Sequence, residues 1–296
     1  MIGVDWGTSN FRAFRLGRDG AILARLSAPR GILQVTDGQF AAALSEAIGS
    51  WLEAGEDRIL LCGMIGSRQG WREAAYVPCP AGIAELAEGI AAVPFEGASV
   101  RLVPGVSTVD PEGVPDVIRG EETKIVGMAA ALDEGGLVCL PGTHSKWVSV
   151  RNRRIAGFTT HMTGEVFGVL RRHSILGRMM RDAPIDWAEF DLALARAGQA
   201  GGWLHHLFGV RTLGLAGRLA DTSAASYLSG LLIGHEVRAA LRPGAVVYLL
   251  GDSALTVQYG RAIAALGGTL RMASEDAAAH GLAAIGAGID WSAGSG

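Results

Sequence analysis

A polar turn, DWGTSN, follows the first apolar run of the chain and combines residue types that bind metal ions and phosphates. Asp5 supplies a carboxylate that can hold Mg²⁺, because hard cations prefer oxygen ligands. The glycine lets the backbone approach a ligand closely, and further donors come from Gly7, Thr8, Ser9 and Asn10. We predict a phosphate-binding turn here, although a tight turn with a satisfied aspartate gives the same pattern.

A second turn, PGTHSK, repeats the glycine–threonine pair and contains Gly142, Thr143, His144, Ser145 and Lys146. Leu140 stands where the first copy has Asp5, so only the first turn can hold the metal through this carboxylate. We expect the two turns to face each other across a cleft and to bind the phosphates of one nucleotide. Lys146 would add a positive charge there, and the alternative is a solvated hairpin lysine.

The segment RGEET, between the two turns, places two carboxylates at the start of a predicted helix. Acidic residues are ordinary in a first helical turn, because the helix dipole favours them in their ionised form. An enzyme that transfers a phosphoryl group to a hydroxyl also needs an acceptor for the hydroxyl proton. We favour Glu122 over Glu121 as that base.

The segment GDSALTVQY follows an apolar strand and opens a helix. It would therefore lie at the carboxyl end of the strand, where open α/β sheets bind ligands. Gly251, Asp252 and Ser253 are our candidates for binding adenosine, although any strand-to-helix turn favours these residue types.

A long loop, GMIGSRQGW, follows a buried strand and carries Arg68, Gln69 and Trp71. Long loops in compact domains are usually functional, and an arginine can bind a substrate carboxylate through two hydrogen bonds. We predict that this loop binds the substrate; a surface arginine is the alternative. His161 and Glu165, in THMTGE, are further substrate candidates, unless His161 only caps a helix.

The elements that must position these motifs occur twice in the same order. The first copy has predicted strands at residues 1–5, 11–16, 21–26, 58–62 and 99–103, with helices at 40–52, 83–92 and 121–132. The second has strands at 137–140, 146–150, 155–160, 245–250 and 269–273, a helical insertion at 163–222, and helices at 223–241, 253–266 and 274–287. We infer an internal duplication into two α/β domains, residues 1–133 and 134–296, each with a mixed five-stranded sheet and helices.

Composition excludes several other classes of protein. The chain has 296 residues, 49% of them hydrophobic, which suits two folded domains better than a disordered chain. A net charge of -3 gives no electrostatic footprint for nucleic acid or for an anionic membrane. Three cysteines without metal-ligand spacing indicate reduced thiols, and no segment has the length or apolarity of a signal peptide or membrane span. We therefore expect a cytoplasmic protein that acts on a small molecule.

Seven motifs occur in order along nearly the whole chain: VDWGTSN, GMIGSRQGWREAAYVPCPAG, RGEET, LPGTHSKWV, MTGE, YLSGLLIGHE and LLGDSALTVQY. Together they resemble the 2-dehydro-3-deoxygalactonokinase family. The resemblance implies an actin-like (ribonuclease H-like) fold, with two duplicated domains facing across a nucleotide cleft. It also implies transfer of the ATP γ-phosphate to the C6 hydroxyl of 2-dehydro-3-deoxy-D-galactonate, in galactonate and galactose catabolism.

Two alternatives stay open at this point. The first is a kinase for another 2-keto-3-deoxy sugar acid, such as the gluconate epimer, which differs at one hydroxyl. The second is a non-enzymatic actin-like module whose interactions depend on ATP. The sequence leaves the oligomeric state undetermined, and a homodimer is one option.

Overall fold

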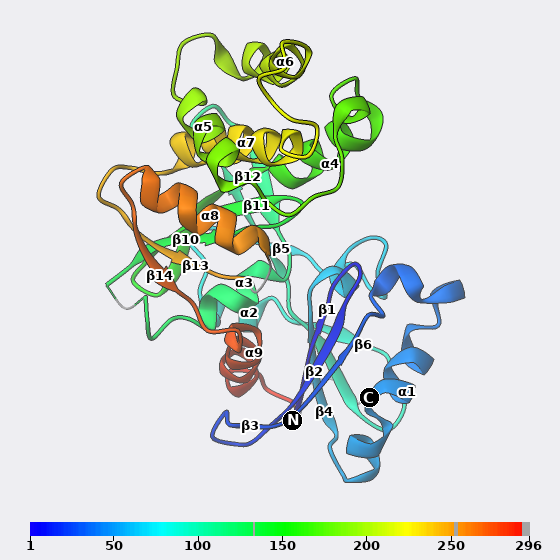
Figure 1. The fold of residues 1–296 in the computed structure, drawn as a ribbon. Helices are drawn as coiled ribbons and strands as arrows, with labels where there is room; N and C mark the ends of the chain where they lie inside the picture. The colour runs from blue at the N-terminus through cyan, green and yellow to red at the C-terminus, as the bar shows by residue number, and fades with distance from the viewer. Residues whose placement is uncertain (133, 252–253, 292–296) are drawn as a thin grey trace. The chain divides into compact units, whose positions relative to one another are not determined.

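The computed structural model describes residues 1–132, 134–251 and 254–291 (Figure 1). These residues form two compact units. The first consists of Met1–Gly135, Ser149–Phe158 and the described residues from Ser274 onward, and the second consists of Gly136–Val148 and Thr159–Ala273. The domain boundary inferred from the duplication, between residues 133 and 134, stays a prediction, because compactness and duplication are different criteria.

The first unit is built on a six-stranded sheet in the order β3-β2-β1-β4-β7-β6. Its strands are β1 (Ile2–Trp6), β2 (Phe11–Leu16), β3 (Ile22–Ala28), β4 (Arg58–Cys62), β6 (Ala91–Val93) and β7 (Ser99–Leu102). β1 pairs antiparallel with β2 and parallel with β4. The residues of β1 are all buried, and the first polar turn begins where this central strand ends.

Helices cover both faces of this sheet. Side chains alternate between the faces of a strand, and those of Ile2, Val4 and Trp6 pack with α1 (Phe40–Glu53). Gly3 points to the other face, where an added Cβ would lie 3.0 Å from Leu282 of α9 (Ala277–Ala287). The last helix of the chain therefore belongs to the first unit.

The first unit also contains short elements around the sheet. They are η1 (Ile32–Gln34), η2 (Thr36–Gly38), η3 (Met64–Gly66), α2 (Ile83–Glu88), α3 (Glu121–Val126), and a three-stranded sheet of β5 (Tyr76–Pro78), β8 (Gly105–Val109) and β9 (Pro115–Ile118). This small sheet was not predicted from the sequence. Its strands of three to five residues alternate too briefly to be distinguished from loop.

Two predicted helices are shorter than expected, and the first sheet has six strands rather than five. The helix predicted over 83–92 ends at Glu88, followed by Gly89, and Ala91–Val93 instead forms edge strand β6, antiparallel to β7. The helix predicted over 121–132 ends at Val126. A Cβ at the next residue, Gly127, would collide with the backbone of Ala277, so α9 packs directly on the end of α3.

A five-stranded sheet in the order β12-β11-β10-β13-β14 belongs mostly to the second unit, except for the parts of β11 and β12 within Ser149–Phe158, and it repeats the order β3-β2-β1-β4-β7 of the first sheet. Its strands are β10 (Gly136–Leu140), β11 (Ser145–Arg151), β12 (Arg154–His161), β13 (Val246–Leu249) and β14 (Thr269–Met272). β10 pairs parallel with β13, which pairs parallel with β14. The recurrence of this order confirms the duplicated fold predicted from the sequence.

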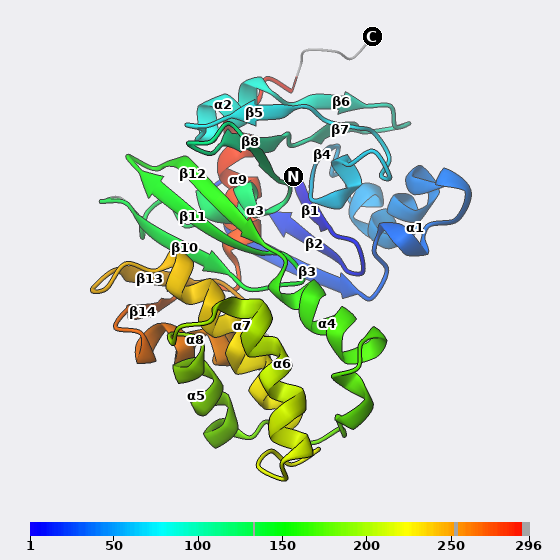
Figure 2. The same ribbon diagram turned by 90° about the horizontal axis from the view of Figure 1, so that it is seen from above.

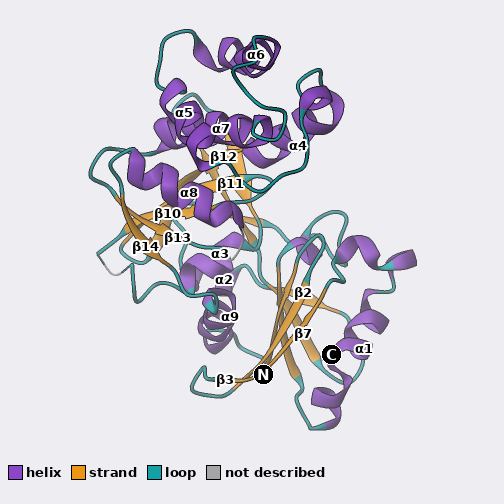
Figure 3. Cartoon of the chain, in the orientation of Figure 1, coloured by secondary structure: helices purple, strands orange, loops and turns teal. Residues whose placement is uncertain are grey.

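Helices dominate the rest of the second unit, as Figures 2 and 3 show. They are α4 (Thr163–His173), η4 (Gly177–Met179), α5 (Trp187–Arg196), α6 (Gly202–Leu215), α7 (Ala224–Ala240) and α8 (Ala254–Ala265). Buried side chains of α5, α7 and α8 pack with the sheet, while α4, α6 and α7 share a second apolar core. None of the helices in the described part of the chain has both the length and the apolarity needed to cross a bilayer.

Candidate active site

Asp5 lies at the end of β1, and its carboxylate is paired with two cations. Arg12, directly opposite in β2, donates from Nη2 to Asp5 Oδ2 at 2.7 Å. Lys124 Nζ lies 3.6 Å from the same oxygen. Burial alone would raise the pKa of Asp5, but the charges of Lys124 and Arg12 outweigh it and lower this pKa. Asp5 is therefore an ionised carboxylate at neutral pH.

The first turn presents exposed donors on a fixed backbone. Gly7 N donates to Asn10 O at 2.9 Å, and Ile32 N donates to Gly7 O at 3.0 Å. A Cβ on Gly31 would collide with the backbone of Thr8, so only glycine lets this neighbouring segment support the turn. Thr8, Ser9 and Asn10 are all exposed, as a phosphate-binding turn requires.

The two RGEET carboxylates occupy different environments. Glu122 is fully buried: Oε2 accepts from Gly120 N at 2.6 Å, and Oε1 accepts from Thr123 Oγ1 at 2.9 Å. Glu121 is half-buried, and its Oε2 accepts from Arg119 N at 3.0 Å. Burial, followed by repulsion from Glu121, raises the pKa of Glu122 to about 7. The helix dipole was expected to stabilise the ionised form of Glu122. Desolvation of the side chain outweighs this effect, because α3 has only six residues.

Lys124 is a candidate residue that the sequence analysis did not assign to the site. The charge of Asp5 raises its pKa, so it remains an ammonium beside the carboxylate. The available signal was its rarity, because Lys124 and Lys146 are the two lysines in a chain with 26 basic residues. The structure thus joins the DWGTSN turn and the RGEET helix through a partly buried ion pair.

The predicted substrate loop exposes its arginine and glutamine to solvent and packs its tryptophan beside the apolar core. The Arg68 side chain is 88% exposed and lies 3.6 Å from Glu73, and Gln69 is exposed as well. Trp71 instead stacks on Phe40, with ring centroids 6.4 Å apart, and packs beside the apolar core. Trp71 thus anchors the loop while Arg68 remains available to a ligand.

The second turn is held against the start of α4. Gly164 allows this contact, since a Cβ there would lie 2.5 Å from Gly142 O, and Glu165 N donates to Thr143 O at 2.9 Å. The side chains of His144 and Glu165 are in hydrogen-bond contact, Nε2 to Oε2. The MTGE motif therefore supports the PGTHSK turn.

Other predicted residues of this region are positioned by hydrogen bonds. Lys146 is 7% exposed, so it is not the solvated lysine considered above, and its Nζ donates to His144 O at 2.6 Å. Ser145 is fully buried and donates to Glu236. His161, at the end of β12, is half-buried with its Nε2 3.4 Å from Thr159 Oγ1.

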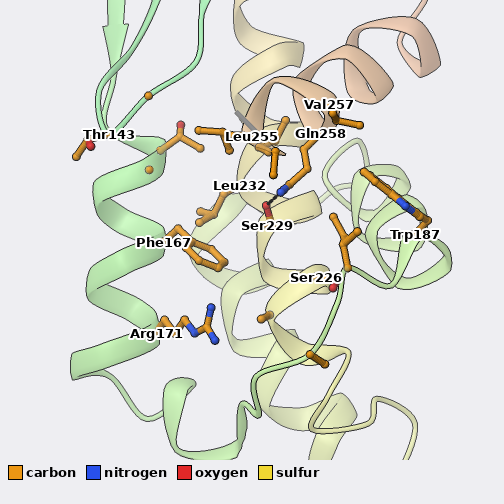
Figure 4. A pocket seen from close by; sticks show the side chains of 18 residues that line it. Thr143, Phe167, Arg171, Trp187, Ser226, Ser229, Leu232, Leu255, Val257 and Gln258 are labelled. Carbon is orange, nitrogen blue, oxygen red and sulfur yellow. Dashed lines mark hydrogen bonds between the residues drawn. The ribbon is translucent and has the colours of Figure 1, made fainter. Parts of the chain in front are cut away.

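A cavity of about 640 Å³ opens beside the second turn within this unit (Figure 4). Its walls come from the turn, α4, α5, α7 and α8, and include Gly142, Thr143, Phe167, Trp187, Ser229 and Gln258. Ser229 Oγ donates to Gln258 Oε1 at 2.5 Å across the pocket wall. Apolar walls with a few polar groups are typical of sites that bind small organic ligands.

The predicted adenosine motif leads into this cavity. Gly251 is exposed after β13, and Ala254, Leu255 and Gln258 at the start of α8 line the cavity. Asp252 and Ser253 lie outside the described residues. The second turn and the helix that follows the GDS motif thus share one pocket.

A divalent metal fits the chemistry of the first turn. Asp5 is an ionised carboxylate whose Oδ2 is bound by Arg12. Among the residues described, no group of three or more His, Cys, Asp or Glu side chains could hold an ion alone. Mg²⁺ commonly binds through one or two carboxylates together with substrate phosphates and water, so a single aspartate is sufficient.

The repeated strand order and the paired glycine–threonine turns define a protein of the actin-like fold, in the class that includes sugar kinases. The activator of 2-hydroxyisocaproyl-CoA dehydratase from Clostridium difficile, solved with bound ADPNP, shares the fold at 12% identity. Its TM-score is 0.50, and 97% of this chain and 93% of that chain are covered.

The chain belongs to the 2-keto-3-deoxy-galactonokinase family, whose sequence model matches residues 5–285. It is 39% identical over 283 residues to a Rhizobium meliloti (strain 1021) protein described as a probable 2-dehydro-3-deoxygalactonokinase, covering 93% of this chain and 92% of the relative. It is 33% identical over 270 residues to the 2-dehydro-3-deoxygalactonokinase of Escherichia coli (strain K12), covering 90% of each. A crystal structure from Sinorhizobium meliloti described under the same kinase name has 37% identity and a TM-score of 0.89, covering 96% of this chain and 97% of that chain.

Proposed function

We propose that this protein transfers the γ-phosphoryl group of ATP to the C6 hydroxyl of 2-dehydro-3-deoxy-D-galactonate, in the breakdown of galactonate. The observation that carries this proposal is the family match over residues 5–285, which includes both turns and the RGEET segment. The relatives at 33% and 39% identity carry the same kinase name. A cytoplasmic location and a homodimer stay predictions from the sequence.

The adenosine part of ATP would bind in the cavity of the second unit. The cavity adjoins Gly142 and Thr143, so a nucleoside there would have its phosphates beside the turn. Phe167 and Leu232 offer apolar surface to the base, and Gln258 offers a carboxamide for hydrogen bonding. Lys146 would contribute positive charge near the phosphates.

In the first unit, Asp5 would hold Mg²⁺, directly or through water. When bound, this ion neutralises charge on the phosphates of the nucleotide. Arg12 and Lys124 keep Asp5 ionised and oriented. Thr8, Ser9 and Asn10 would donate hydrogen bonds to phosphate oxygens from the exposed turn.

The RGEET carboxylates would accept the proton that leaves the C6 hydroxyl as its oxygen bonds to phosphorus and the bond to the ADP oxygen breaks. A base works best with a pKa near the working pH, and burial raises the pKa of Glu122 to about 7. Glu121 is the more accessible of the two. Glu122 remains our first candidate and Glu121 the second, with Glu121 helping to orient the loop through Arg119 N.

The acid substrate would be recognised by the loop that carries Arg68 and Gln69. A 2-keto acid is an anion with a planar carboxylate, which matches the two-pronged geometry of a guanidinium. His161 and Glu165 would add contacts to the sugar hydroxyls. The guanidinium of Arg68 is exposed, and the substrate carboxylate would replace the exposed Glu73 as its partner.

A coupled assay for ADP release, run on a panel of 2-keto-3-deoxy sugar acids, tests the proposal. We expect the galacto acid to have the highest kcat/KM, with product phosphorylated at C6 by mass and NMR spectroscopy. A higher kcat/KM for the gluconate epimer would assign the enzyme to that acid instead. ATP turnover that no sugar acid alters, or assembly that depends on ATP, would favour the non-enzymatic alternative.

A further inference from the structure

Glu236, near the end of α7, is a buried carboxylate that the proposed reaction does not use. It is 4% exposed and accepts hydrogen bonds from three neutral donors. Its Oε1 accepts from Ser145 Oγ at 2.7 Å and from Trp147 Nε1 at 2.8 Å, and its Oε2 accepts from Tyr259 OH at 2.5 Å. A buried carboxylate costs free energy unless it is hydrogen-bonded, so these donors are what make the position tolerable.

The donors belong to elements that also form the walls of the cavity. Ser145 begins β11 directly after the second turn, whose Thr143 lines the cavity. Tyr259 follows Gln258 on α8. Glu236 lies two helical turns from Ser229 on α7. One carboxylate thus connects the turn and two of the helices that form the cavity.

The bond from Ser145 is the one that fixes the turn. Ser145 is fully buried, and its hydroxyl has a single proton, which is directed to Glu236 at 2.7 Å; His161 O lies farther away, at 3.3 Å. A separation of 2.7 Å is typical of a well-formed O–H···O hydrogen bond. The hydroxyl therefore holds the backbone of the turn from inside the unit.

We propose that Glu236 is a positioning residue that holds the PGTHSK turn at a fixed distance from the cavity. At that distance one nucleotide can place its nucleoside in the cavity and its phosphates on the turn. The inference rests on the proposed function, because it takes the cavity to be the nucleotide site. This role explains the YLSGLLIGHE motif. Ser229 and Leu232 line the cavity, and Glu236 holds the turn through Ser145. Small displacements of groups that bind the reacting part of a substrate are costly, so loss of the anchor weakens nucleotide binding.

The test measures ADP binding by calorimetry in the full-length protein without any sugar acid. Glu236→Gln keeps the shape of the side chain and replaces one acceptor oxygen by an amide NH2, and Ser145→Ala removes the donor. We expect each single variant to bind ADP about 5- to 10-fold more weakly than the wild type. The double variant should bind ADP no more than about twofold more weakly than the single variant with the lower affinity, because both substitutions break the same hydrogen bond. The KM for the sugar acid stays within about twofold of wild type.

Ser223→Ala is the matched control, because Ser223 Oγ also donates to a carboxylate, Asp186 Oδ2, at 2.7 Å in the same unit. Ser223 is absent from the described cavity lining, so its loss lowers Tm and leaves ADP binding unchanged. Folded variants at Glu236 and Ser145 that bind ADP as the wild type does would overturn the inference, as would losses that multiply in the double variant. If Glu236→Gln does not fold, Ser145→Ala decides alone. Wild-type protein that binds no ADP would instead overturn the proposed function.

Discussion

The ammonium nitrogen of Lys124 lies 3.6 Å from Asp5 Oδ2, which ties the helix of the RGEET motif to the first turn. Charge on Lys124 and on Arg12 keeps the pKa of Asp5 low despite burial. Asp5 is thus ionised wherever the enzyme would work. This pairing leads to the first prediction, on the proposed metal ligand.

Asp5→Asn should lower kcat by about 10²-fold or more, because the amide cannot replace a carboxylate in holding Mg²⁺. Steady-state rates over a range of Mg²⁺ concentrations measure the effect. Asp276→Asn is the control: it removes a carboxylate that also accepts from an arginine, Arg25, at 2.7 Å in the same unit. Near-wild-type turnover of Asp5→Asn at ordinary Mg²⁺ would contradict the role.

Glu122→Gln should lower kcat by about 10²- to 10⁴-fold with little change in KM, as expected for a lost general base. In the wild type, kcat should rise with pH up to about 7, where the Glu122 carboxyl ionises. Glu121→Gln should be milder, and it should move the rise in kcat to lower pH, because it removes the repulsion that helps to raise the pKa of Glu122. If both variants remain within about threefold of wild type, the base lies elsewhere, and Glu165 becomes the candidate.

The raised pKa of Glu122 also predicts how stability changes with pH. Folding raises this pKa from 4.5 to about 7, so the folded state binds more protons than the unfolded state between these values. The free energy of unfolding therefore falls as pH rises through this range, by up to about 3 kcal/mol. Urea denaturation at several pH values should show a smaller fall for Glu122→Gln. Equal slopes for the two proteins would contradict the burial argument.

Arg68→Ala should raise the KM for the sugar acid by roughly 10-fold or more and leave the KM for ATP nearly unchanged. A lost charge-assisted contact to the carboxylate is the physical reason. Arg72→Ala, in the same loop, is the control, because the Arg72 guanidinium is bound to the Ala92 carbonyl. An effect on ATP alone would assign the loop to the nucleotide.

Gln258→Leu should reduce the preference for ATP over GTP by about 10-fold. The reason is that a site that hydrogen-bonds the polar edge of one base strongly rejects a base that cannot make the same hydrogen bond. The ratio of kcat/KM for the two nucleotides measures it. Gln199→Leu changes a glutamine bound to Arg196, away from the cavity, and should leave the ratio unchanged. An unchanged ratio in Gln258→Leu would remove this residue from base recognition.

The central strands and the duplication were predictable because their signals are local. Ile2–Trp6 and Gly136–Leu140 are apolar runs that end in similar turns, and the elements around them repeat in order. The contacts of Glu236 were not predictable, since its donors lie 91, 89 and 23 positions away in the sequence. The available signal was a carboxylate at the end of the mostly apolar YLSGLLIGHE segment.

The environment of Glu122 shows a second limit of the sequence. Position in the first turn of a helix suggested an ionised carboxylate, but complete burial of the side chain outweighs the dipole of a six-residue helix. The surroundings of α3 include α9, which packs against it from about 155 residues away in the sequence. Local patterns predict where a charged residue lies along the chain, whereas its proton affinity depends on distant segments.

The packing of α9 on the first unit has a consequence for how the protein is made. Gly127 and Gly281 let the backbones of α3 and α9 touch, and Leu282 covers the face of β1 at Gly3. The ribosome therefore synthesises the whole second unit before α9, the segment that completes the core of the first unit. Domains usually fold in the order of their synthesis, but here the nascent first unit exposes one apolar face until α9 has been made.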